Sequence, residues 1–93
     1  MDLRFNRDPE SGLPHFFDHG VTEEEVLEVL LRRGEIRRGS EDSWVKIGQT
    51  SAGRYLKVVY VPQETGELLV VTAFEIRGNI LKAFRRRQRR KHR

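Results

Sequence analysis

The sequence contains no cysteine among its 93 residues. This absence excludes a disulfide framework, a thiolate zinc site and a cysteine nucleophile, and it removes any sign of an oxidising compartment. No apolar run approaches the roughly 20 residues that a membrane-spanning helix needs, and the N-terminus lacks the apolar core of a signal peptide. The sequence therefore predicts a cytoplasmic protein without a membrane association.

Several catalytic motifs are also missing. The sequence has no phosphate-binding loop, no G-x-G-x-x-G and no G-x-S-x-G, so nothing in it indicates nucleotide hydrolysis or esterase chemistry. His15 and His19 have the i, i+4 spacing of two metal ligands on a helix, but no Glu follows His15 and no third ligand is evident. We expect neither a metal nor a cofactor.

The length predicts one domain over residues 1–93. A chain this short buries only roughly 60–65% of the surface that its unfolded form exposes. It can form one core but has little room for a deep cavity, so we expect any functional site to be a surface groove.

Charge is distributed very unevenly along the chain. The nine residues from Arg85 to Arg93 contain six Arg, one Lys and no acid, and removing these seven charges from the total of +4 leaves −3 on the rest. Such asymmetry favours a localised contact with a polyanion or an acidic protein. The alternative, a solvated tail that aids solubility, is less favoured, since solvated faces usually mix both signs of charge. Arg matches phosphate with a planar fork of donors. Within a basic C-terminal helix or tail at 79–93, the predicted RNA-binding residues are Arg85, Arg86, Arg87, Arg89, Arg90 and Lys91.

The N-terminal third has helical signals. Residues 1–6 can form a short strand, and His15 to His19 can form one or two helical turns that end at Gly20. A second helix is predicted from Thr22 to Arg33, because Thr22 and Glu25 have capping-box spacing and an apolar face follows.

After Gly34 the hydrophobic period changes from helical to strand-like. Strands are expected near 35–38, 44–48, 55–61 and 67–76, followed by a helix that begins with the apolar stripe of Ile80, Leu81 and Phe84. The predicted fold class is α+β, with two N-terminal helices, a twisted antiparallel sheet of three to four strands and a C-terminal basic helix. The residues expected in the core include Leu30, Val45, Ile47, Val58 and Val70.

The predicted strands also carry candidate catalytic residues: Lys46, Arg54, Tyr55 and Tyr60. RNA can be cleaved without a metal when its own 2′-hydroxyl attacks the adjacent phosphate and the protein supplies cations and proton-transfer groups. Alternation places Arg54 and Tyr60 on one face of their strand and Tyr55 on the other. The alternative is that these residues are simply exposed strand positions, where Arg, Lys and Tyr are common.

The order of these segments resembles the BrnT-type toxins of bacterial type II toxin–antitoxin systems, a branch of the RelE/ParE-like ribonuclease toxins. The resemblance covers roughly residues 4–90. It rests on His19-Gly20-Val21-Thr22 before a Glu-rich helix, on the stretches at 44–48, 53–60 and 71–74, and on the Arg-rich helix that follows. By position, Lys46, Arg54 and the arginines from Arg85 onward match the basic active-surface elements of that family.

The resemblance implies a compact α+β fold, RNA cleavage without a metal, and a cognate acidic antitoxin that covers the active surface. The leading hypothesis is therefore a toxin-like, metal-independent endoribonuclease of the mRNA interferase type, acting on RNA that includes ribosome-associated mRNA. Two other hypotheses use the same basic helix: a non-enzymatic RNA- or ribosome-binding module, and a domain that docks on an acidic partner. A homo-oligomer is compatible with all three.

Overall fold

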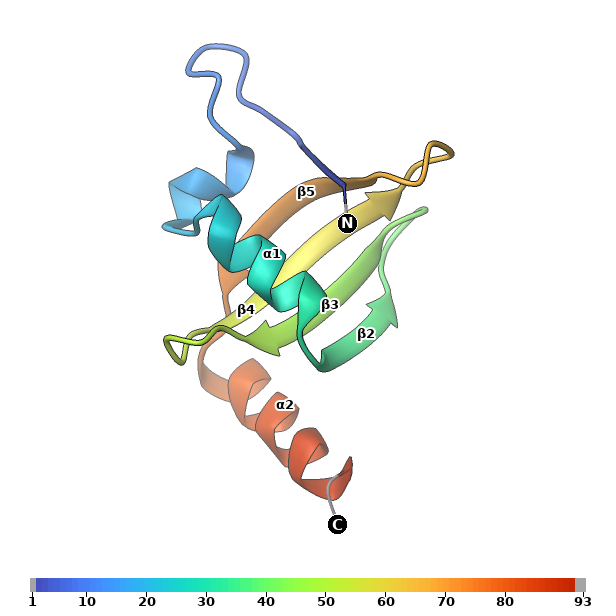
Figure 1. The fold of residues 1–93 in the computed structure, drawn as a ribbon. Helices are drawn as coiled ribbons and strands as arrows, with labels where there is room; N and C mark the ends of the chain where they lie inside the picture. The colour runs from blue at the N-terminus through green and yellow to red at the C-terminus, as the bar shows by residue number, and fades with distance from the viewer. Residues whose placement is uncertain (1, 92–93) are drawn as a thin grey trace.

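The computed structural model describes residues 2–91. Its elements, in chain order, are β1 (Leu3–Phe5), the 3-10 helix η1 (His15–His19), α1 (Glu23–Leu31), β2 (Gly34–Arg38), β3 (Trp44–Gln49), β4 (Tyr55–Pro62), β5 (Leu68–Glu75) and α2 (Gly78–Lys91). The strands form one sheet in the order β1-β5-β4-β3-β2, with η1 and α1 against one face and α2 extending from one end (Figure 1).

The α+β class is confirmed, but the predicted arrangement of strands and helices is wrong. The sheet has five strands instead of three or four, and it is mixed, because β1 runs parallel to β5 with Leu3 opposite Leu68. A three-residue strand that pairs with another strand more than 60 positions later in the chain leaves no local pattern in the sequence. The remaining four strands are antiparallel neighbours, as the hairpin signals predicted.

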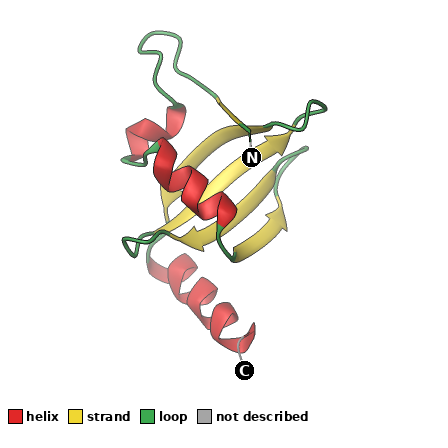
Figure 2. Cartoon of the chain, viewed as in Figure 1, coloured by secondary structure: helices red, strands yellow, loops and turns green. Residues whose placement is uncertain are grey.

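The prediction of two N-terminal helices is also wrong, because only α1 is an α-helix there (Figure 2). In η1 the backbone N–H groups of Phe17 and Gly20 donate to carbonyls three residues earlier, the 3-10 pattern. Gly20 then adopts a left-handed conformation (φ 70°) that stops the segment after five residues.

The start of α1 follows the sequence signal. The Thr22 hydroxyl accepts from the backbone N–H of Glu25, and the Glu25 carboxylate accepts from the backbone N–H of Thr22, so the expected capping box is formed. The helix ends at Leu31, two residues before the predicted Arg33.

The main core lies between α1, η1 and the covered face of the sheet. It includes Phe16, Val26, Val29 and Leu30 from the helical side, and Leu56, Val58, Val70 and Ala73 from the strands. Leu30, Ile47, Val58 and Val70 are buried as expected, whereas Val45 is only half-buried, at the margin of the cluster on the opposite face.

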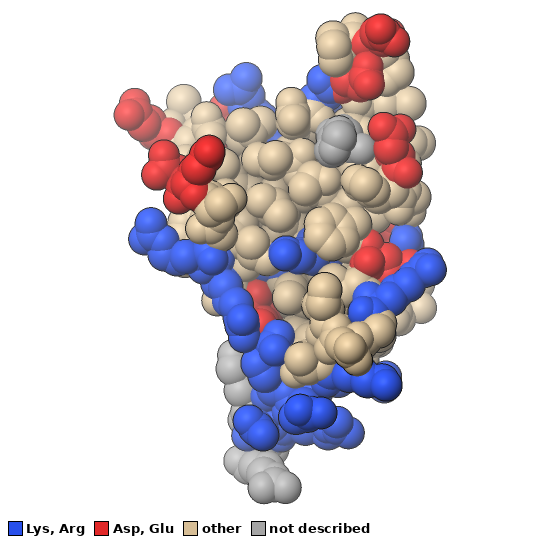
Figure 3. All heavy atoms as spheres, turned by 180° about the vertical axis from the view of Figure 1, so that it is seen from behind, with Lys and Arg blue, Asp and Glu red and all other residues tan. Residues whose placement is uncertain are grey.

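A second, smaller apolar cluster attaches α2 to that opposite face. Phe84 is 3% exposed and packs with Ile47 and Ile76, with Val45, Tyr55, Phe74 and Leu81 at the margin. Burial of one Phe side chain contributes about 1.5–3 kcal/mol, enough to hold the first turns of α2 against the end of the sheet. Seen from behind, this face is largely uncharged, and Lys and Arg gather over α2 (Figure 3).

Candidate nucleic-acid interface

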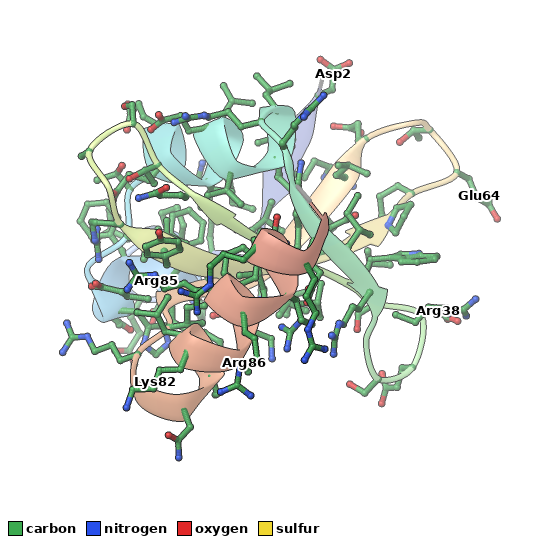
Figure 4. The ribbon with its side chains drawn as sticks, turned by 90° about the horizontal axis from the view of Figure 1, so that it is seen from below. Asp2, Arg38, Glu64, Lys82, Arg85 and Arg86 are labelled. Carbon is green, nitrogen blue, oxygen red and sulfur yellow. The ribbon has the colours of Figure 1, made fainter. Side chains whose placement is uncertain are left out.

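One side of α2 presents a row of cations. Lys82, Arg85, Arg86 and Arg89 are spaced i, i+3, i+4 and i+7, so they share one side of the helix. Within the described part of the chain, these four residues alone line a groove of about 330 Å³. The labelled side chains of Lys82, Arg85 and Arg86 lie on this side of α2 (Figure 4). Arg90, one position further on, is also exposed. We call Lys82, Arg85, Arg86, Arg89 and Arg90 the arginine face.

The charges of the arginine face are not neutralised within the described part of the chain. None of its five members forms an ion pair with a carboxylate of residues 2–91. Mutual repulsion along one helix side is unfavourable, by a few tenths of a kcal/mol per pair. A bound polyanion would remove that repulsion.

Arg87 differs from its neighbours because it points toward the sheet. Its Nε and Nη2 donate to the two carboxylate oxygens of Glu35 at 2.6 and 2.8 Å, a bidentate pair between α2 and β2. Arg37 also pairs with Glu35, whose side chain is 7% exposed. Arg87 was predicted to bind RNA, but its guanidinium is already engaged, and it positions α2. The side chain of Lys91, also predicted to bind RNA, lies outside the described residues.

A pocket of about 390 Å³ opens beside the arginine face, where α2 passes the ends of β3 and β4. Its polar lining comes from Arg33, Gln49, Tyr55, Arg85, Gln88 and Arg89, and its apolar floor from Gly48 and Phe84. Arg85 and Arg89 belong to both the pocket and the cationic groove. We call this cavity the Tyr55 pocket.

Tyr55 is the aromatic centre of the pocket. Its ring meets Phe84 edge-on, with centroids 5.9 Å apart, and the Arg85 guanidinium carbon lies 5.6 Å from its centroid. Gln88 reaches the same place from α2, and its side-chain Nε2 is buried without a hydrogen-bond partner among the described residues. A buried amide donor without a partner is costly, by about 1–3 kcal/mol, unless a ligand supplies an acceptor.

The other three candidate catalytic residues lie away from this pocket. Lys46, 7% exposed, is on the covered face, where its Nζ donates to the carbonyls of Leu30 and Arg32. These carbonyls are at the C-terminal end of α1, so the ammonium group caps the negative end of that helix. Burial lowers the pKa of Lys46.

Lys46→Met should therefore reduce stability. Methionine keeps most of the side-chain length but removes the donor to two carbonyls, and we expect a loss of about 1–3 kcal/mol in the free energy of unfolding. In a domain of this size that corresponds to a fall in Tm of about 4–8 °C per kcal/mol. Urea denaturation of this variant and of Lys82→Met, an exposed control expected to change by about 0.5 kcal/mol or less, provides the comparison. Equal stability of the two variants would remove Lys46 from the support of α1.

Arg54 is engaged in a structural ion-pair network. Its Nη1 donates to both carboxylate oxygens of Glu25 at 2.9 and 2.8 Å and to the carbonyl of Gly20, and its Nη2 pairs with Glu75 at 3.3 Å. Hydrogen bonds from Arg77 and Arg54 hold the pKa of Glu75 below its usual range. Arg54 thus connects the start of α1, the end of η1 and β5.

We expect Arg54→Met to cost about 1–3 kcal/mol, because Glu25 and Glu75 lose a shared partner. The Glu75 contribution is present above its unperturbed pKa of 4.5 and is lost as the pH falls through the lower folded value. The difference in stability between wild type and variant should accordingly shrink below about pH 4.5. Thermal unfolding from pH 7 to 3 checks this, with Arg4→Met, at an exposed position of β1, as control; a pH-independent difference would contradict it.

Tyr60 is 9% exposed and belongs to the main core, and burial raises its pKa. Arg54 and Tyr60 do share a strand face, as alternation predicted, but it is the face covered by α1 and η1. Of the four candidates, only Tyr55 lies with the arginines of α2. Sequence reasoning missed Arg33, Gln49 and Gln88; the available signal was Gln88, the single uncharged side chain within the run from Arg85 to Lys91.

Among the described residues, every helix is too short or too polar to cross a membrane. No protein-family model matches the chain, and the comparisons with curated proteins and with solved structures found no match.

Proposed function

We propose that this protein binds RNA through the arginine face of α2. The observation that supports the proposal is the row of five exposed cations without an acidic partner among residues 2–91, on a helix anchored by Phe84 and Arg87. Phosphate contacts by Arg and Lys release counterions and supply most of the sequence-independent affinity for nucleic acids. The choice of RNA over DNA rests on the resemblance to ribonuclease toxins.

The first test measures RNA binding by the intact protein as a function of salt. Each phosphate contact contributes about 0.7 to the slope of log affinity against log salt for a single strand, so four or five contacts predict a slope of roughly −3 to −3.5. A slope near zero, or no binding at low salt, would contradict the proposal.

A metal-independent endoribonuclease is the second candidate function. It is favoured by the position of Tyr55, whose hydroxyl-bearing ring shares a pocket with Arg33, Arg85 and Arg89. In this reaction the 2′-oxygen attacks phosphorus, the bond to the 5′-oxygen breaks, and a cyclic phosphate and a 5′-hydroxyl are formed. The arginines would stabilise the added negative charge, and Tyr55 would transfer a proton.

In this second proposal, Lys46, Arg54 and Tyr60 take no part in the chemistry, because their polar groups are engaged or buried on the covered face. The test is incubation of the protein with RNA under metal chelation, followed by analysis of the ends. If the protein binds the RNA but the RNA remains intact, the cleavage proposal is wrong and RNA binding remains as the proposed function.

The arginine face would also serve an acidic protein partner. In a toxin–antitoxin pair, which the sequence resemblance suggests, an acidic antitoxin would cover α2 in the cytoplasm and compete with RNA. Release of bound RNA by such a partner is the expected result.

A further inference from the structure

The Tyr55 pocket and the cationic groove adjoin one another along α2. Among the described residues, the pocket is lined by two aromatic rings, two amides and arginines, whereas the groove is lined by Lys82, Arg85, Arg86 and Arg89. The two share Arg85 and Arg89. A cavity lined by aromatic and amide side chains therefore lies directly beside the cationic groove.

This pairing matches the two chemical parts of a nucleotide. Bases stack on aromatic rings and on guanidinium planes and use their edges for hydrogen bonds, whereas phosphates take arginine forks. The cavity of about 390 Å³ falls in the range of small-ligand sites. We propose that the Tyr55 pocket accepts one unstacked RNA base while the groove holds the adjoining phosphates, so that the protein selects single-stranded or looped RNA over duplex.

The amide groups support a base in preference to a second phosphate. Gln49 lines the pocket, and its Nε2 donates to the carbonyl of Gly53, which leaves its side-chain oxygen as an acceptor. The buried Nε2 of Gln88 lacks an acceptor. An acceptor and a donor among the lining residues suit the mixed edge of a nucleobase, whereas a phosphate offers acceptors only.

The planar groups provide the stacking surface. Tyr55 meets Phe84 edge-on and carries the Arg85 guanidinium, so the two planar groups already lie against one another. Stacking on such a platform contributes about 1–3 kcal/mol per base. A duplex keeps its bases stacked on each other, so it reaches the groove but not the pocket.

The inference rests on the proposed RNA-binding function, and its test compares two forms of RNA. Fluorescence anisotropy at one salt concentration measures the affinity of the intact protein for a single-stranded 12-nucleotide RNA and for the same strand in a duplex. We expect wild type to prefer the single strand by roughly tenfold, from one stacked base. Gln88→Met should reduce that preference to about twofold or less, with duplex affinity and the salt slope unchanged. Tyr55→Leu should reduce the preference as well.

Gln63→Met is the matched control, because Gln63 is an amide in the β4–β5 turn, outside the pocket. It should keep the full preference. Thermal unfolding identifies any effect of Tyr55→Leu on packing against Phe84, and Gln88→Met tests the pocket without touching that contact. The inference would be overturned if wild type bound both RNA forms with equal affinity, or if the two variants lost affinity equally for both forms. Either result would leave the proposed RNA binding intact. Absence of binding to either form would overturn both.

Discussion

Replacing Arg85, Arg86, Arg89 and Arg90 together by glutamine is expected to lower RNA affinity by about 10²–10³-fold near 0.1 M salt. Each lost phosphate contact removes about 0.7 from the salt slope, so the slope should fall by about 2.8. Glutamine keeps the helix propensity and the polarity of the side chain. The measurement is a salt titration of anisotropy for wild type and variant.

The control variant removes the same number of positive charges from residues outside α2. Arg4, Arg38, Lys57 and Arg77 lie off α2, and their joint replacement by glutamine lowers the net charge by the same four units. If binding depends on α2, this control should weaken RNA affinity by less than about tenfold through long-range attraction alone. Equal losses in the two quadruple variants would show that net charge, and not the arginine face, determines affinity.

Truncation after Phe84 would not test the arginine face alone. The truncation would remove the exposed arginines but also Arg87, whose guanidinium forms two hydrogen bonds with Glu35. Loss of these two hydrogen bonds weakens the compensation of the buried Glu35 carboxylate, which keeps its pair with Arg37, and detaches α2 from β2. Point substitutions on the arginine face avoid this effect, so any loss of RNA affinity can be assigned to contacts with the ligand.

Tyr55→Phe is expected to lower the rate of RNA cleavage by about 10²–10⁴-fold if the second candidate function is correct. The substitution removes only the phenolic oxygen, and loss of one proton-transfer group has an effect of this size. The ring, its edge-on contact with Phe84 and the Arg85 guanidinium beside it remain. Single-turnover cleavage under metal chelation is the measurement.

Tyr60→Phe provides the matched control, since Tyr60 lies on the same strand but in the main core. It should cleave at close to the wild-type rate. Full activity in Tyr55→Phe would exclude this residue from the chemistry, and equal losses in both variants would indicate a defect in folding. RNA affinity measured on the same samples separates binding from catalysis.

The local elements were predictable because their signals are local. The capping residues Thr22 and Glu25 are three positions apart, and the change of hydrophobic period after Gly34 needs only a short window. The basic helix was evident from composition. The predicted alternation of side chains along β4 was also correct, since Arg54 and Tyr60 lie on one face of the strand and Tyr55 lies on the other.

Which face is covered was decided only by tertiary structure. Alternation divides a strand into two faces but does not say which one receives α1, so Lys46 and Arg54 were equally compatible with an exposed groove. Their partners lie 14 to 34 positions away, at the carbonyls of α1, at Gly20 and at Glu25. Such contacts form only when the chain folds back on itself.

By itself, the sequence determined the capped helix α1, the antiparallel strand run and a C-terminal helix with unbalanced positive charge, because propensity, period and composition act over a few residues. Tertiary structure alone decided the parallel pairing of β1, the structural roles of Lys46, Arg54 and Arg87, and the meeting of Tyr55 with Gln88 in one pocket. The physical reason is that a charged side chain takes its role from the partners that long-range packing brings to it, and those partners have no fixed spacing along the chain.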